Sequence, residues 1–149
     1  MLKVKLCREG AKMPTYATPG AACFDIHAVT GDSTVIVSAH GKSQSDQPIA
    51  TGLQFEIPEG YALMIYSRSG HGFKFDTRLS NCVGVIDSDY RGEVFIKLTC
   101  DNEDEYMVVH HGDRIAQAML IPVPQVPLVE VYELNVTERG TGGFGSTGR

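Results

Sequence analysis

The stretch IATGLQFEIPEGYALMIY, residues 49–66, decides the fold class of this chain. It holds two short segments, Ile49–Ile57 and Tyr61–Tyr66, that are rich in aliphatic and aromatic side chains and predict β-strands. Pro58–Gly60 lies between them and predicts a strong turn, because proline presets its own φ and glycine accepts conformations that other residues avoid. Helix signals are nearly absent, here and in the rest of the chain.

The same pattern of short apolar runs, separated by Gly, Pro, Asp and Ser, continues in both directions. The predicted strands are Leu2–Cys7, Cys23–Ala28, Thr34–Val37, Ile49–Ile57, Tyr61–Tyr66, Val94–Thr99, Tyr106–His110, Ile115–Ile121 and Leu128–Leu134. So many short strands in 149 residues predict a single all-β domain, a sandwich, jelly roll or related antiparallel fold.

Two stretches interrupt this pattern. Gly31–Gln47 is polar and rich in serine, which predicts a hairpin with an extended surface loop. Pro122–Pro127 alternates proline with other residues and cannot pair continuously in a sheet, because proline lacks the backbone donor. This stiff connector carries the last predicted strand away from the body. Such a connector suits a strand that docks on a neighbouring subunit. A segment that runs along a sheet edge of its own chain explains it equally well.

Composition and charge exclude several classes of protein. A hydrophobic content of 42% fits a globular chain, and a net charge of −5 argues against a general nucleic-acid surface. No apolar run resembles a signal peptide or is long enough to cross a membrane. The four cysteines form no C-x-x-C pair and the five histidines show no metal-binding spacing. We therefore expect reduced thiols and a cytoplasmic protein.

The segment NCVGVIDSDYRGE, Asn81–Glu93, is the densest group of polar side chains between glycines. A regular strand would place Asp87 and Tyr90 on opposite faces, so they can act together only if the chain turns at Ser88 and Asp89. Considered alone, this segment fits a solvent-exposed turn that carries polar side chains as well as it fits a functional site.

Other polar groups stand at strand ends or inside apolar strands. Arg68, Ser69 and Gly70 follow a predicted strand and would make a compact phosphate site or a polar turn. Asp25 is a carboxylate within an apolar strand, so it needs an arginine partner or a hydrated Mg²⁺. Gln117 lies within another apolar strand, where its amide must bind structural partners or a catalytic water.

The end of the chain, RGTGGFGSTGR, is rich in glycine and predicts a flexible tail. Phe144 and the arginines at either end suggest instead a clamp that stacks on a ring and binds anionic oxygens. The spacing of Gly140 and Gly145 resembles a P-loop, but Ser146 replaces the lysine and no helix follows, so it is not one.

Five segments in this order resemble the deoxyuridine triphosphatase (dUTPase) family of the homotrimeric type, with GVIDSDYRG and RGTGGFGS as the most specific motifs. They are Ala21–Ala28, Ser67–Gly70, Asn81–Glu93, Gly112–Gln117 and Arg139–Gly148. The resemblance implies a jelly-roll or distorted β-barrel domain over 1–138, a flexible arm over 139–149, and a trimer with active sites shared between subunits. It also implies hydrolysis of dUTP to dUMP and pyrophosphate with Mg²⁺, which limits uracil in DNA and supplies dUMP for dTMP synthesis.

The resemblance assigns roles to individual residues. Asp87 would activate the attacking water and Gln117 would position it, while Tyr90 would pack under the deoxyribose and exclude a 2′-hydroxyl. Uracil would be bound by Asn81, Gly84, Val85 and Ile86. The phosphates would be bound by Arg68, Ser69 and Gly70. Asp25 would contact Mg²⁺ through water. The arm would close over the site with Arg139, Phe144, Gly145 and Ser146.

Several positions depart from the family's usual pattern. Ser67 replaces a common proline, Cys23 replaces a glycine, and His71–Phe73 stands where small aliphatic residues are typical. The loop Gly31–Gln47 is also longer than usual. A dCTP deaminase or a bifunctional deaminase-triphosphatase on the same fold is the nearest rival, but that chemistry needs a glutamate near the base and no Gly-Phe-Gly tail. A non-catalytic module that docks through the long loop is the other alternative.

Overall fold

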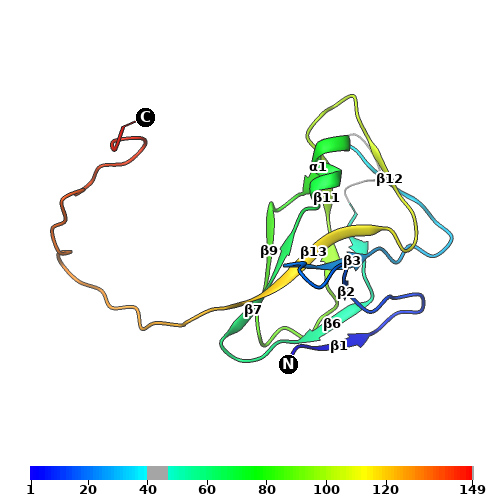
Figure 1. Cartoon of the computed structure of the whole chain (residues 1–149), viewed down its shortest axis with the longest axis horizontal. Coiled ribbons are helices and arrows are strands. Elements are labelled where there is room, and N and C mark those ends of the chain that lie inside the picture. The colour runs from blue at the N-terminus through cyan, green and yellow to red at the C-terminus, as the bar shows by residue number, and fades with distance from the viewer. Residues whose placement is uncertain (40–46, 149) are drawn as a thin grey trace.

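The computed structural model describes residues 1–39 and 47–148, and this part of the chain consists of short strands and one short helix (Figure 1). The all-β prediction is therefore confirmed. The elements are β1 (Lys3–Leu6), β2 (Thr15–Tyr16), β3 (Phe24–His27), β4 (Val35–Val37), β5 (Ile49–Ala50), β6 (Leu53–Glu56), β7 (Tyr61–Tyr66), α1 (Ser69–Phe75), β8 (Thr77–Leu79), β9 (Val83–Ile86), β10 (Phe95–Ile96), β11 (Leu98–Cys100), β12 (Met107–Val109) and β13 (Arg114–Pro122).

The largest sheet has five antiparallel strands in the order β2-β3-β13-β7-β9. β13 is its central strand, and the register places Gln117 opposite Asp25 on β3 and opposite Tyr66 on β7. The remaining strands pair two by two, as β1-β6, β5-β10, β8-β11 and β4-β12. Each of these pairs is also antiparallel.

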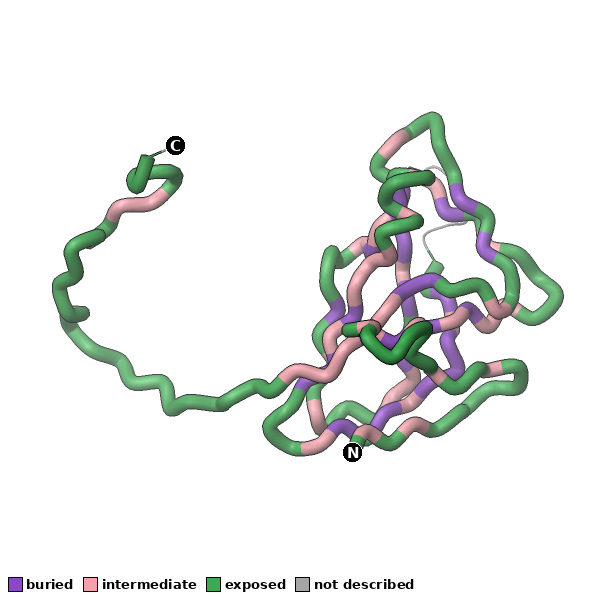
Figure 2. The backbone as a smooth tube through the Cα atoms, viewed as in Figure 1, coloured by how far each residue is buried: buried purple, intermediate pink, exposed green. Residues whose placement is uncertain are grey.

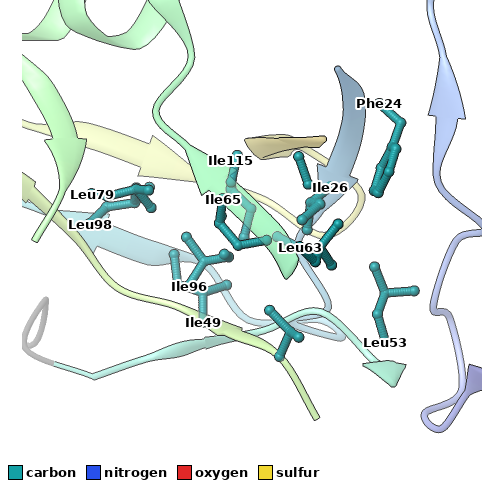
Figure 3. Packing of buried hydrophobic residues seen from close by; sticks show 14 of the residues in the cluster. Phe24, Ile26, Ile49, Leu53, Leu63, Ile65, Leu79, Ile96, Leu98 and Ile115 are labelled. Carbon is teal, nitrogen blue, oxygen red and sulfur yellow. The ribbon is translucent and has the colours of Figure 1, made fainter. Parts of the chain in front are cut away.

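One hydrophobic core lies inside these sheets. Ile26, Leu53, Leu63 and Ile115 are fully buried and pack together (Figure 3). Burial alternates along β3, so its apolar residues point inward while Asp25 is only partly buried. The alternation that fills the core therefore also presents a carboxylate on the opposite face of the sheet.

Two of the predicted strands are interrupted. Ile49–Ile57 forms β5 and β6, because the buried hydroxyl of Thr51 donates to the carbonyl of Val94 (2.5 Å) and Gly52 adopts a φ of 67°. Val94–Thr99 likewise forms β10 and β11, separated at Lys97. The predicted turn at Pro58–Gly60 is confirmed by the hydrogen bond from Tyr61 N to Pro58 O (3.2 Å). It connects strands that belong to different sheets.

Some elements were not predicted. Helix α1 contains two glycines and buries no side chain, so it has no apolar periodicity to detect. The short strands β2, β8 and β9 were also missed. The predicted hairpin within Gly31–Gln47 is not seen in the described residues, since β4 pairs with the distant β12. Residues 40–46 of that loop lie outside the described residues.

The chain leaves the body after Pro122 and extends away from it (Figure 1). Residues 123–148 contain no strand or helix and are almost entirely exposed (Figure 2). The predicted strand Leu128–Leu134 is therefore wrong for the single chain, where this segment pairs with no strand. Most of its side chains are nevertheless apolar, and Leu128 is 95% exposed. Among the described helices, none is long and apolar enough to span a bilayer.

Candidate active site

The segment that follows β9 forms the turn that the sequence required. The amide of Tyr90 donates to the carbonyl of Asp87 (3.2 Å), which closes a turn over Ser88 and Asp89. As a result Asp87 and Tyr90 line one cavity of about 320 Å³, together with Val85, Ile86, Glu93, Val94 and Phe95. Asp87 is exposed to solvent at the mouth of this cavity.

Tyr90 is fixed by a hydrogen bond and by a close contact. Its hydroxyl donates to the carbonyl of Glu93 (3.0 Å). A Cβ at Gly92 would lie only 2.3 Å from that hydroxyl, closer than non-bonded atoms approach. Gly92 is therefore required for the observed position of the phenol ring, since any side chain there would displace it.

A second cavity of about 300 Å³ lies beside β9. It is lined by the predicted base-binding residues Asn81, Gly84, Val85 and Ile86, among others. A Cβ at Gly84 would meet the Cβ of Ile65 at 3.0 Å, so the glycine lets β9 pack closely on β7. Cys82, with a φ of 63°, turns the chain so that Val83 N donates to Asn81 O (2.7 Å).

A separate cluster lies at the end of β7, where Asp25 pairs with two arginines. One carboxylate oxygen accepts from Arg68 Nε and the other from Arg114 Nη1, both at 3.2 Å. In the single chain Asp25 therefore has arginine partners, one of the two alternatives that the sequence left open. Arg68 Nη1 also lies 3.4 Å from His71 Nε2, and burial lowers the pKa of this histidine. Ser69 and Gly70 are exposed at the start of α1.

Gln117 connects this cluster to the sheet. Its Nε2 donates to the carbonyl of Ser67 (2.9 Å), and the hydroxyl of Ser67 accepts from Leu79 N (2.9 Å). The amide therefore anchors the residue that precedes Arg68. Arg68 and Arg114 line a cavity of about 680 Å³ that shares no residue with the two cavities beside β9. The single chain thus presents the predicted site as two separate parts.

The predicted arm residues lie in neither part. Arg139 Nε donates to the carbonyl of Gly142 (2.8 Å), and the side chain of Phe144 is fully exposed. Gly145 and Ser146 also lie in the arm, at the far end of the molecule from the sheets (Figure 1). Only the start of the segment after Pro122 stays close to the body, where Val123 N donates to Gly60 O (2.8 Å) and Val123–Gln125 line a cavity with Asp87.

The described residues include no group of three or more histidine, cysteine or acidic side chains that could hold a metal ion. The sequence alone does not predict two residues of the site, Arg114 and Glu93. Arg114 reaches Asp25 across 89 positions, and Glu93 takes part in the cavity of Tyr90. No local motif reveals such contacts, because they depend on strand pairing.

Comparisons with known proteins agree with one another. Residues 9–148 match the family model described as dUTPase. The deoxyuridine 5′-triphosphate nucleotidohydrolase of Anaplasma marginale (strain St. Maries) is 42% identical over 152 residues, and that of Nautilia profundicola is 44% identical over 148. Each alignment covers 99% of both chains. Among solved structures, the dUTPase of Staphylococcus bacteriophage 80alpha (G164S mutant) with dUpNHpp is 30% identical with a TM-score of 0.84. The match covers 100% of this chain and 99% of that one.

Gly92→Ala tests the packing of Tyr90. The added methyl must displace the phenol ring or the backbone, so we expect a loss of about 1–3 kcal/mol in the free energy of unfolding. Urea unfolding at a fixed protein concentration measures it. Gly20→Ala is the matched control, because a Cβ at Gly20 meets no atom within 4 Å. Equal stability of the two variants would contradict the contact.

Proposed function

Because the chain belongs to the dUTPase family, we propose that it hydrolyses dUTP to dUMP and pyrophosphate. The observation that supports this proposal is that the two cavities beside β9 share lining residues. Val85 and Ile86 line both of them, so a base in one cavity would direct its sugar toward Tyr90 and Asp87 in the other.

Recognition of uracil and deoxyribose follows from the shape of these cavities. Asn81 and the backbone of β9 offer donors and acceptors to the edge of the base, which selects uracil over cytosine. Close packing of β9 on β7 at Gly84 would keep the base cavity narrow and so exclude a 5-methyl group. The ring of Tyr90 would pack under the sugar and exclude a ribose 2′-hydroxyl, so the deoxy sugar would be preferred.

Asp87 is the proposed general base. Its carboxylate is exposed, so a water molecule can reach it. It takes a proton from a water as that water forms a bond to the α-phosphorus. The bond from the α-phosphorus to the bridging oxygen then breaks, and pyrophosphate leaves. Gln117 uses one amide N–H for Ser67 and keeps its carbonyl oxygen to orient the water.

Arg68, Ser69 and Gly70 are proposed to bind the phosphates. The residues present fit a Mg²⁺ ion that arrives with the triphosphate. Each oxygen of Asp25 has an arginine at 3.2 Å, a long distance for a charge-assisted hydrogen bond, so lone pairs remain for a water of the hydrated ion. The described residues supply no cage for a resident ion. When bound, Mg²⁺ would neutralise charge on the phosphates.

We further propose a homotrimer that shares its active sites. In the single chain the phosphate cluster and the cavity of Asp87 are separate, and the arm with Arg139, Phe144, Gly145 and Ser146 covers neither. The arm also exposes apolar side chains such as Leu128 and Tyr132, which favours packing on another copy. Arm closure would exclude bulk water from the phosphates. The cysteines are free, which fits the reducing cytoplasm.

Pyrophosphate release from a panel of nucleoside triphosphates tests the proposed function. We expect rapid release from dUTP in the presence of Mg²⁺, a large loss of rate in EDTA, and little release from dCTP, dTTP or UTP. Mass spectrometry of the nucleotide products completes the assay. Uracil nucleotides formed from dCTP, or equal hydrolysis of dTTP, would overturn the proposal in favour of the related deaminase or a general phosphatase.

Asp87→Asn tests the base assignment. The amide keeps the shape of the side chain but cannot accept the proton, so kcat should fall by about 10²–10⁴-fold. Affinity for the analogue dUpNHpp, measured by calorimetry, should change little. Asp89→Asn makes the same chemical change two residues away in the same turn and should retain most of the turnover. Near-normal kcat in Asp87→Asn would refute the role of this carboxylate.

A further inference from the structure

The loop after β1 reaches the end of the Asn81–Glu93 segment through an ion pair. Arg8 Nε donates to both carboxylate oxygens of Glu93, at 2.7 and 2.8 Å. The Glu93 side chain is only 11% exposed, whereas that of Arg8 is 46% exposed. The hydrogen bond from Arg8 is the main cause that lowers the pKa of Glu93. A largely buried carboxylate thus depends on an arginine 85 positions away.

Glu93 is held from a second side by Gly52, whose amide donates to the same carboxylate (2.9 Å). A Cβ at Gly52 would lie 2.5 Å from the Cβ of Ala11 and 3.2 Å from that of Arg8. The amide of Cys7 also donates to the carbonyl of Gly52 (2.8 Å). The loop that carries Arg8 is therefore packed against Gly52, and the carboxylate of Glu93 joins the two.

The same residue, Glu93, forms part of the wall of the Tyr90 cavity. Its carbonyl accepts the hydrogen bond from the Tyr90 hydroxyl, so the backbone position of Glu93 determines where the phenol lies. Arg8 contacts this wall a second time, since its guanidinium stands 5.7 Å from the ring centroid of Phe95. Arg8 itself does not line the cavity.

We infer that Arg8 is a positioning residue that acts through Glu93 to hold Tyr90 against the sugar, and that it thereby sets discrimination between deoxyribose and ribose. This inference rests on the proposed function, in which Tyr90 excludes the 2′-hydroxyl. Arg8 contacts neither the sugar nor the reacting atoms. Its effect is confined to the position of the phenol ring and of the Phe95 side chain.

The effect of Arg8 on sugar selectivity can be measured separately from its effect on folding. Arg8 is about half exposed and the Gly52 amide still donates to Glu93, so we expect loss of Arg8 to cost some stability without unfolding the domain. The Glu93 carboxylate is left with fewer donors and must relax toward water. The backbone at Glu93, which Arg8 no longer ties to the loop after β1, can then shift, and the Tyr90 hydroxyl that donates to its carbonyl shifts with it. Because a 2′-hydroxyl adds only one oxygen, a small shift of the phenol is enough to admit it.

The test compares Arg8→Gln with Lys3→Gln in the full-length protein. Lys3 also makes a cross-strand ion pair, with Glu56 (2.6 Å), but both partners are well exposed and lie outside the sugar cavity. The measured quantity is kcat/KM for dUTP divided by kcat/KM for UTP. We expect Arg8→Gln to reduce this ratio by about tenfold, in the range of steric discrimination, and Lys3→Gln to leave it unchanged.

Arg8→Lys and thermal unfolding complete the design. Lysine keeps one charged donor toward Glu93, so Arg8→Lys should have a ratio of kcat/KM for dUTP to that for UTP between those of Arg8→Gln and the wild-type protein. All three variants should unfold within a few degrees of the wild-type protein. An unchanged ratio in Arg8→Gln overturns the inference, even if the turnover of dUTP falls. Absence of dUTP hydrolysis in the wild-type protein would instead refute the proposed function, so the two failures are distinguishable.

Discussion

Strand β13 pairs along both of its edges, and the register of these two ladders determines where the polar residues of the phosphate cluster lie. Gln117 stands opposite Asp25 on one side and Tyr66 on the other, and its amide binds the carbonyl of Ser67. A slip of one residue would turn Gln117 into the core and bring an alanine to the outer face. The buried residues of β3, β7 and β13 oppose such a slip, because they must all face the same interior.

The cavity of Asp87 depends on a different constraint, which is the close approach of backbone and side chains at glycine. Gly84 lets β9 lie against Ile65, and Gly92 leaves space for the Tyr90 hydroxyl. The tight turn at Asp87–Tyr90 lies between them. These contacts shape the proposed base and sugar cavities within one chain, whereas the phosphate cluster and the arm are placed elsewhere. This division supports the proposed trimer with shared active sites.

Sequence patterns were sufficient to predict strands and turns whose structure depends on local interactions. The continuous apolar run Tyr61–Tyr66 matches β7 in full, and the turn residues after Ile86 bring Asp87 and Tyr90 to one cavity. Helix α1 escaped detection because two glycines and an exposed face leave no periodic signal. The strand predicted at Leu128–Leu134 has residues suited to pairing, but in the single chain this segment leaves the body and pairs with no strand. The contacts of Asp25 with Arg114 and of Arg8 with Glu93 join distant segments, so only the fold reveals them.

We propose that one copy of the chain supplies the arm and another supplies Asp87 to the same site. Mixing two inactive variants is the sharpest test: Asp87→Asn, and a chain truncated after Glu138, unfolded together and refolded as mixed assemblies. Each variant alone should show almost no dUTP hydrolysis. We expect turnover in the mixture far above the sum of the two, because an intact Asp87 and an intact arm then meet in some sites. Turnover no greater than that sum, in assemblies shown to contain both chains, would contradict it.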